Sequence, residues 1–235
     1  MIIHFDFILW PMLIPMFLPL IYALMYKLDS LIEIGVITLS MLLIVISYWP
    51  LTLRFNSTSN IVTKFLLFIL LPLFLLYIAF NVQNKLKNEK RVISFERFGI
   101  RRDGLKNSLL LGLLLIPLML LFTYAAKYMI GGFYEANFSV GIVSFVESFT
   151  EEFFFRGVLF LFLISRTDLK IAYTTSLASF VLMHPQNFSN LFIISTILQG
   201  FLTLEICRRS KNIVGAWILH GTNRFFSIAI FPFLL

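Results

Sequence analysis

Four ionisable side chains stand close together in an otherwise apolar stretch of the sequence. Residues 140–164 form a window apolar enough for a membrane-spanning helix, yet this window contains Glu147, Glu151, Glu152 and Arg156. A charged side chain at the centre of a bilayer costs roughly 2.5–3.5 kcal/mol on insertion scales. Each of these residues therefore needs a reason to be there, which is either a structural ion pair or chemistry.

The spacing divides the four residues into two pairs. Glu152 precedes Arg156 by four positions, which is the favourable orientation for an ion pair on a helix. Glu147 and Glu151 are also four positions apart, and no cation between them separates the two carboxylates. Like charges repel strongly in a low dielectric, so we expect one of the two to carry a proton. A carboxylate without a cation is a candidate general base, metal ligand or proton carrier.

Two of the three histidines also lie in apolar segments. His184 precedes Pro185, which disfavours helical geometry at the residue before it, so we expect the helix to break or end there. His220 is followed by Asn223 and Arg224 in the last apolar window. A single buried histidine is more often a structural hydrogen-bonding residue than a catalytic one. Together, a glutamate, two histidines and an asparagine suffice to activate water and to hold a developing oxyanion.

Motifs of several other membrane enzymes are absent from the sequence. It contains no His-Glu-x-x-His zinc motif, no Gly-x-Gly-Asp aspartyl motif and no rhomboid-type Gly-x-Ser motif. The Asp-rich diphosphate-binding motifs of prenyltransferases are missing too, which argues against lipid transfer.

The composition shows where these residues must be held. Hydrophobic residues make up 59% of the 235 residues and charged residues 13%, about half the usual charged share. The mean hydropathy is +0.91. Such a chain cannot cover a water-exposed surface, so we expect an integral membrane protein. The single cysteine, Cys207, excludes an intramolecular disulfide.

Apolar windows predict an all-α bundle of about eight transmembrane helices with the active site inside the bundle. A span of ~20 residues crosses a bilayer core of ~30 Å. The sixth and seventh windows are short, which leaves a broken or re-entrant element open. The predicted spans are Phe7–Tyr26, Leu31–Pro50, Ile61–Phe80, Ser108–Ile130, Val140–Ile164, Ile171–Pro185, Leu191–Ile206 and Ile213–Leu235.

The basic residues predict an orientation for the bundle. Residues 82–107 form a basic loop, and cytoplasmic loops collect Lys and Arg, so we place this loop inside. With alternating spans, fourteen of the nineteen basic residues then fall on the cytoplasmic side and both termini lie outside. Arg54, Lys64 and Lys127 fall outside or near the outer ends. The loop has no nucleic-acid-binding motif, so we expect the lipid bilayer and not a nucleic acid as its neighbour.

At these polar residues the chain resembles the CAAX protease and bacteriocin-processing (CPBP, or Abi) family of intramembrane proteases, the type II CAAX prenyl endopeptidase-like proteins. Glu151-Glu152-Phe-Phe-Phe-Arg156 matches its Glu-Glu-x-x-x-Arg motif, and Phe180-Val-Leu-Met-His184 matches its Phe-x-x-x-His motif. His220 with Asn223 is similar to the third motif, in which a His precedes an Asn or Asp. The resemblance covers roughly residue 101 to the C-terminus.

The resemblance implies a role for each motif residue. Glu151 would be the base that activates water, and His184 would assist by hydrogen bonding or by binding a metal. Glu152 and Arg156 would form a structural pair. His220 and Asn223 would stabilise the oxyanion as water attacks a peptide carbonyl.

Two positions depart from the family pattern. The third motif usually places its Asn four residues after the His, where this chain has Arg224. The guanidinium could replace the Asn at the oxyanion or pair with a nearby Glu. Glu147 lies outside the motifs. It is either a polar residue near the outer end of the helix, or one that shifts the pKa of Glu151 or lines the substrate path.

The motif residues are compatible with a metal site and with a metal-free site. One Glu and two His, namely Glu151, His184 and His220, could bind one zinc ion or another divalent metal with an open position. The same residues also make a metal-free glutamate site, which we favour slightly.

The leading hypothesis for function is hydrolysis of a peptide bond in a membrane-associated peptide or protein, in or at the edge of the bilayer. Residues 101–235 would form the catalytic core, and residues 1–100 the N-terminal helices with the basic loop, all in one membrane domain. We expect a prokaryotic plasma membrane and favour a peptide substrate over a prenylated protein. The alternatives are a non-catalytic immunity factor or scaffold of the same fold, and a small proton-coupled transporter.

Overall fold

The computed structural model describes residues 10–26, 29–52, 57–87, 90–131, 135–184, 187–188 and 190–234. These residues contain helices and no strands, which confirms the predicted all-α fold. The helices are η1 (Trp10–Met16), α2 (Phe17–Met25), α3 (Leu31–Thr52), α4 (Ser57–Lys64), η2 (Phe65–Leu70), α5 (Leu71–Lys87), η3 (Phe95–Phe98), α6 (Leu105–Ile130), α7 (Phe138–Glu152), η4 (Phe153–Phe162), α8 (Leu169–Leu182), α9 (Phe192–Ser210), α10 (Val214–Phe225), η6 (Phe226–Ile230) and α11 (Phe231–Leu234).

Several of these elements join end to end, so each of the eight predicted spans corresponds to one continuous helix. Helix α4 runs through η2 into α5, α7 runs into η4, and α10 runs through η6 into α11. Three described helices, Leu31–Tyr48, Ile61–Lys87 and Leu105–Ile130, are long and apolar enough to cross a membrane. The α8 helix is shorter, with 14 residues, as its short apolar window predicts.

The outer surface of the bundle is apolar. On α6, the side chains of Leu110, Leu113, Leu114 and Leu121 are all more than half exposed. Exposed apolar side chains also occur on α2, α3 and α5, and so many of them would be unfavourable in water. Surrounded by lipid, the same surface is stable, and the protein is therefore an integral membrane protein.

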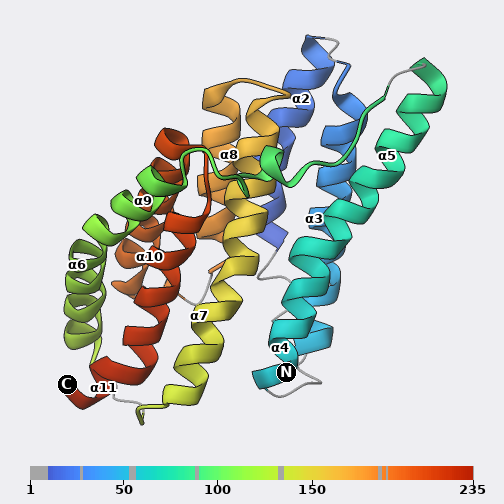
Figure 1. The fold of residues 1–235 in the computed structure, drawn as a ribbon. Coiled ribbons are helices and arrows are strands. Elements are labelled where there is room, and N and C mark those ends of the chain that lie inside the picture. Colours follow the sequence, from blue (N-terminus) through green and yellow to red (C-terminus); the bar gives the residue numbers. More distant parts are fainter. Residues whose placement is uncertain are drawn as a thin grey trace.

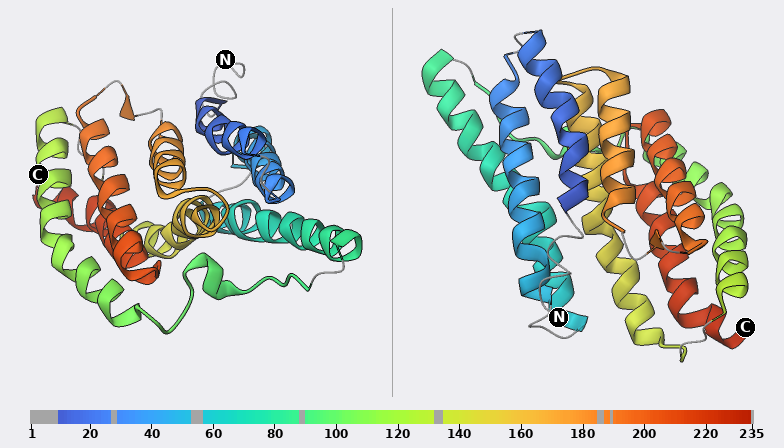
Figure 2. Two further views of the ribbon diagram at one scale, coloured as in Figure 1. Left: turned by 90° about the horizontal axis from the view of Figure 1, so that it is seen from above. Right: turned by 180° about the vertical axis from the view of Figure 1, so that it is seen from behind.

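The α7–η4 helix is the central element of the bundle (Figure 1). Helix α7 contacts α10, α4 and η2, and η4 contacts α8, α9 and η3. Seen from above, the yellow α7–η4 helix lies between the red α10 and the teal α5 (Figure 2). Every residue of η4 is buried. Apart from Arg156, its sequence, Phe-Phe-Phe-Arg-Gly-Val-Leu-Phe-Leu-Phe, is apolar on all sides, which is typical of a helix surrounded by others.

Small residues bring α6 and α10 close together. A Cβ added to Gly215 would lie 1.8 Å from the Ser108 carbonyl oxygen, and one added to Gly112 would lie 2.5 Å from the Gly215 carbonyl oxygen. Only glycine fits at such backbone contacts, as in many packed membrane helices. The Ser108 hydroxyl also accepts the Gly215 backbone N–H at 2.8 Å, which fixes the start of α10.

The predicted basic loop 82–107 is shorter than expected, because both its ends are helical. Helix α5 continues to Lys87 and α6 begins at Leu105. Lysines in the last turn of a helix interact favourably with its dipole, so the basic residues near Lys87 extend α5 rather than end it. The remaining segment crosses one end of the bundle, where the ring of Phe98 stacks on that of Phe162 with the centroids 5.3 Å apart.

An ionic contact ties the N-terminal helices to the rest of the bundle at the same end. Glu33, at the start of α3, is fully buried. Its carboxylate lies 2.6 Å from Arg91 Nη1, after α5, and 3.2 Å from Arg166 Nε, between η4 and α8. The division into residues 1–100 and a catalytic core of residues 101–235 stays a prediction.

Candidate active site

Four helices bring their polar side chains to one buried place. Glu147, Glu151 and Glu152 come from the last turns of α7, and His184 lies two residues beyond the end of α8. His220, Asn223 and Arg224 lie on α10, and Lys64 is the last residue of α4. The structure thus brings together the residues of all three sequence motifs.

Local hydrogen bonds at the helix starts fix these helices. The Asn137 side chain accepts from Val140 N–H at the start of α7, and the Asp168 side chain accepts from Ile171 N–H at the start of α8. At the start of α10, Asn212 Oδ1 accepts from Val214 N–H at 2.9 Å. Asparagine and aspartate favour such N-caps because their short side chains satisfy amides that lack a partner in the first turn.

The two carboxylate oxygens of Glu151 have different neighbours. Lys64 Nζ lies 2.6 Å and Arg224 Nη1 lies 2.9 Å from Oε1. Oε2 is buried and accepts no hydrogen bond from the described residues. It faces His184 Nε2 and His220 Nε2, each at 3.9 Å. These distances are too long for direct hydrogen bonds and suit a bridging water.

The other ring nitrogen of each histidine is held in place. His184 Nδ1 lies 2.8 Å from the Phe180 carbonyl oxygen, and His220 Nδ1 lies 2.7 Å from Glu152 Oε1. A carbonyl and a carboxylate only accept, so both Nδ1 atoms carry the proton. In the neutral rings, the Nε2 lone pairs therefore point toward Glu151. His184 stands just after the last helical residue of α8, as expected, while Pro185 lies outside the described residues.

Glu152 and Arg156 lie next to each other, with Arg156 Nε 3.3 Å from Glu152 Oε2, and both are fully buried. Arg156 also donates to Thr203 Oγ1 and to the Gly200 carbonyl oxygen, at 2.9 Å and 3.2 Å respectively. Its guanidinium lies 4.4 Å from the centre of the Phe180 ring. These contacts connect α7, α8 and α9, and Phe180 is also the residue whose carbonyl holds His184.

Asn223 lies on α10, three residues after His220, and is buried. Its Nδ2 donates to Gln199 Oε1 of α9 at 2.6 Å. Asn223 Oδ1 is buried and has no hydrogen-bond partner among the described residues. Nδ2 carries two hydrogens and Gln199 accepts one of them, so the second N–H of Asn223 can donate to a ligand.

Arg224 pairs with the glutamates, which is one of the two roles expected for it. Besides Glu151, its Nη2 lies 3.6 Å from Glu147 Oε2. Lys64 also forms an ion pair with Glu147. The expectation that no cation accompanies Glu147 and Glu151 is therefore wrong, because two cations from other helices lie beside them.

Sequence reasoning missed Lys64 because it is 87 positions away from Glu151. The charge pattern along the sequence places it at an outer helix end, among the residues that set the topology. One signal pointed to it, since Lys64 falls inside the predicted span Ile61–Phe80. A lysine inside an apolar span needs a partner, for the same reason as the charges of α7.

The helices that carry Lys64, Glu152 and Arg224 each change to π-helical geometry within two residues of these charges. The π-helix η2 begins at Phe65, next to Lys64, and the π-helix η4 begins at Phe153, next to Glu152. The π-helix η6 begins at Phe226, two residues after Arg224. Short π-helical stretches are rare and occur frequently at functional sites.

The surroundings of Glu151 do not fit a divalent metal ion. The donor types alone, one carboxylate and two imidazoles, would suit zinc. However, Glu151 is already bound by Lys64 and Arg224, and both would repel a dication. In the part of the chain that the structure describes, no group of three His, Cys, Asp or Glu side chains is arranged to hold a metal ion.

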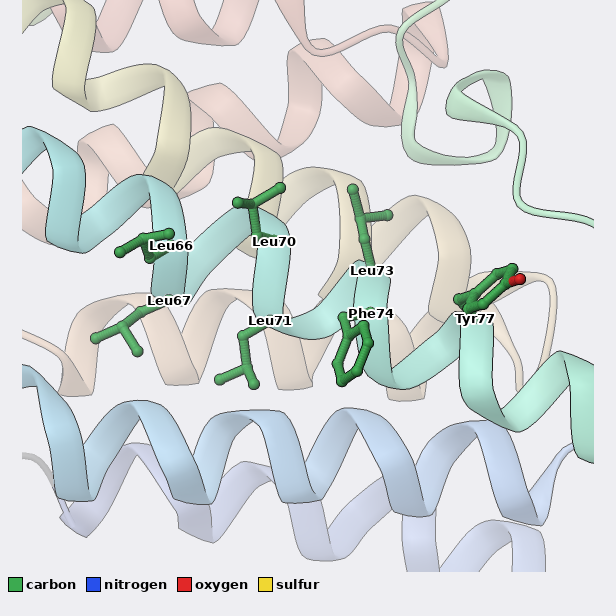
Figure 3. A pocket seen from close by; sticks show the side chains of 7 residues that line it. All are labelled: Leu66, Leu67, Leu70, Leu71, Leu73, Phe74 and Tyr77. Carbon is green, nitrogen blue, oxygen red and sulfur yellow. The ribbon is translucent and has the colours of Figure 1, made fainter.

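An apolar groove of about 600 Å³ follows Lys64 along the same continuous helix. The groove is open, and its lining side chains extend from successive turns of η2 and α5 (Figure 3). They are Leu66, Leu67, Leu70, Leu71, Leu73, Phe74 and Tyr77. None of these residues is charged, so the groove is separate in character from the ionisable site.

Comparison with known proteins identifies the segment that carries the site. Residues 133–226 match the model of the family described as type II CAAX prenyl endopeptidase Rce1-like. No curated protein and no solved structure matches the chain. The matched segment contains Glu151, His184 and His220, and it confirms the resemblance that the motifs predict. Over residues 133–226 the chain is therefore similar to the type II CAAX prenyl endopeptidase Rce1-like proteins.

Proposed function

We propose that this protein is an intramembrane endopeptidase in which Glu151 activates a water molecule. The observation that carries the proposal is the arrangement at Glu151 Oε2, which faces two imidazole Nε2 atoms at 3.9 Å each. A water molecule bound between these atoms donates one hydrogen bond to Glu151 and one to Nε2 of the neutral His184 ring. Glu151 takes up a proton as the water oxygen attacks the peptide carbonyl carbon, and it passes this proton to the departing amine.

The developing oxyanion needs hydrogen-bond donors. Asn223 has an amide N–H that its bond to Gln199 leaves available. Protonated His220 can donate from Nε2, because the buried carboxylate of Glu152 accepts from its Nδ1 and stabilises the imidazolium. Glu152 is in turn held by Arg156. This gives the structural pair a positioning role beside the proposed catalytic residues.

The substrate that we propose is a membrane-associated peptide or protein. The α7 helix with Glu151 lies at the centre of a bundle whose outer surface is apolar. A peptide bond that reaches this place must enter through the bilayer or along its edge. We infer that the protein acts in a prokaryotic plasma membrane with the basic loop in the cytoplasm.

The reaction that we propose needs no metal ion, because Lys64 and Arg224 already neutralise the carboxylates at the site. We expect that chelators leave cleavage unchanged. If a chelator abolishes cleavage and zinc restores it, Glu151, His184 and His220 are metal ligands and the metal-free mechanism fails.

The experiment that tests the function is cleavage of a reporter in cells. A membrane-anchored peptide library is expressed with the wild type or with one of three variants, Glu151→Ala, His184→Ala or His220→Ala. We expect cleavage by the wild type and a loss of roughly 1,000-fold or more in each variant, since each removes a group that acts on the water or the oxyanion.

Protein amounts in the membrane fraction, measured by immunoblot, control for folding. Lys170→Ala, at an exposed position in the first turn of α8, serves as a variant that should cleave normally. Full cleavage of a proven substrate by all three site variants would show that the site is assigned wrongly. Absence of any cleavage by the wild type across the library would favour a non-catalytic scaffold or immunity protein.

A further inference from the structure

Lys64 belongs to the active site although it lies outside the segment that matches the family. Its ammonium group contacts both Glu147 and Glu151. The Lys64 side chain is 5% exposed and the Glu151 side chain 1% exposed. Water therefore compensates neither charge, and the two depend on each other.

The four charges at this place balance. Glu147 and Glu151 contribute two negative charges, and Lys64 and Arg224 contribute two positive charges. The pairs are interlinked, because each cation contacts both carboxylates. A buried charge that loses its partner is strongly unfavourable in a low dielectric. Removal of any one member thus leaves an uncompensated charge beside Glu151.

The cations also orient the carboxylate. Lys64 and Arg224 both contact Oε1 of Glu151, from α4 and α10 respectively. With Oε1 fixed from two sides, the other oxygen must face the histidines. Lys64 therefore affects both the charge of the Glu151 carboxylate and which of its oxygens faces the histidines.

We propose that Lys64 is a positioning residue that holds Glu151 as a carboxylate with Oε2 turned toward His184 and His220, and that Glu147 is the counter-ion that keeps this buried lysine in place. The inference rests on the proposed peptidase function. It extends the active site to the N-terminal half of the chain. It also gives Glu147 a role that the sequence motifs do not.

The test is a double-mutant cycle with Lys64→Met and Glu147→Gln, measured on a substrate that the wild type cleaves. We expect Lys64→Met to lower kcat on the order of 100-fold, because Glu151 loses its orientation. The acid limb of its pH–activity profile should move up by about one pH unit or more, since a carboxylate without its cation takes up a proton more readily. Glu147→Gln alone should move the limb to lower pH, because an excess positive charge remains.

The double variant Lys64→Met/Glu147→Gln restores the charge balance, with Arg224 still bound to Glu151. We expect it to recover at least about tenfold of the activity lost in Lys64→Met and to return the acid limb toward the wild type. Lys64→Arg, which keeps the charge, should lose less than Lys64→Met. A merely structural lysine predicts neither the opposite pH shifts nor recovery by a second substitution.

Several other titratable groups lie near Glu151 and Lys64. Glu147 lies on the same helix, Arg224 and His220 on α10, and His184 after α8. The ring of Tyr48 on α3 lies 5.9 Å from Lys64 Nζ. These groups are unchanged in the Lys64→Met variant, so a shift of its profile reports on the lost cation.

Lys85→Met is the matched control, because Lys85 lies on the same continuous helix and is exposed. It should cleave like the wild type. Wild-type kcat and pH profile in Lys64→Met would overturn the inference while leaving the peptidase function intact, and so would a double variant no more active than Lys64→Met. If the wild type cleaves and Glu151→Ala cleaves equally well, the proposed function itself fails.

Discussion

Glu151 combines two demands that conflict for a carboxylate in a membrane. Burial away from water favours the protonated form, which cannot accept a proton from water. Lys64 and Arg224 favour the charged form, but they also make the oxygen that they contact a weak base. The structure separates these demands between two atoms, since both cations contact Oε1 and leave Oε2 toward the histidines.

Asn223 gives a prediction at the scale of a single side chain. If its free amide N–H donates to the oxyanion, Asn223→Ala should lower kcat by about 10²–10³-fold with little change in KM, as for the loss of one oxyanion donor. The measurement is steady-state cleavage of a proven substrate by purified protein. The control is Thr222→Ala at the neighbouring half-buried position, which should retain wild-type kcat.

A change in KM alone would contradict this role and would place Asn223 in substrate binding. The kcat and KM effects are measured separately because Asn223 stands one position earlier than the third motif of the family usually places its Asn. On a helix, an Asn three residues after a histidine points about 100° away around the axis from an Asn four residues after it. In the structure, the residue at four positions is Arg224, and its guanidinium contacts Glu147 and Glu151.

The sequence predicted the residues of α7, α8 and α10 that gather at the site, because each is a costly polar group in an apolar window. It could not predict that Lys64 joins them. Spacing along one helix shows which residues share a face, but it does not show which face of another helix comes to meet them. The same limit applies to Gln199, the partner of Asn223, which looks like an ordinary polar residue in the sequence.

At the scale of the helices, π-helical geometry recurs at the site. The backbone hydrogen bonds of a π-helix join residues five positions apart, one more than in an α-helix. Every later side chain is therefore shifted around the helix axis. In α4–η2–α5, α7–η4 and α10–η6–α11, this shift begins within two residues of a charged residue. The charged residue and the apolar residues beyond it can thus face directions that a regular α-helix would not allow. Apolar periodicity does not reveal such segments, so the sequence predicted the spans but not their geometry.

The close contact of α6 with α10 gives a prediction at this scale. Gly215→Ala should destabilise the protein, because the added Cβ would lie 1.8 Å from the Ser108 carbonyl oxygen. Forced overpacking of this kind costs about 1–3 kcal/mol, which lowers Tm by several degrees in a chain of this size. The measurement is thermal unfolding of the detergent-purified protein.

Gly35→Ala is the matched control, since a Cβ at this position in α3 has no neighbour within 4 Å. It should leave Tm unchanged or raise it slightly, because alanine favours a helix more than glycine does. Equal Tm values for Gly215→Ala and the wild type would show that α6 and α10 lie farther apart than in the structure.

At the scale of the whole molecule, the charges fall into two groups with different roles. Most basic residues lie near helix ends and between helices, where they predict the orientation of the bundle. A few ionisable residues lie inside, and the structure pairs them with partners on other helices. Because Lys64 and the motif residues lie on opposite sides of the basic segment in the sequence, both halves of the chain contribute to one site.

The orientation can be tested with two matched substitutions. Glu96 lies in the basic segment and Glu135 lies between α6 and α7, and both are exposed. In a Cys207→Ala background, Glu96→Cys and Glu135→Cys each provide one reactive thiol, and Cys207 itself is fully buried. The predicted topology places Glu96 in the cytoplasm and Glu135 outside. A maleimide that cannot cross membranes should therefore label Glu135→Cys in intact cells, but Glu96→Cys only after permeabilisation. Labelling of Glu96→Cys in intact cells would reverse the orientation, and a substrate would then have to reach Glu151 from the opposite face.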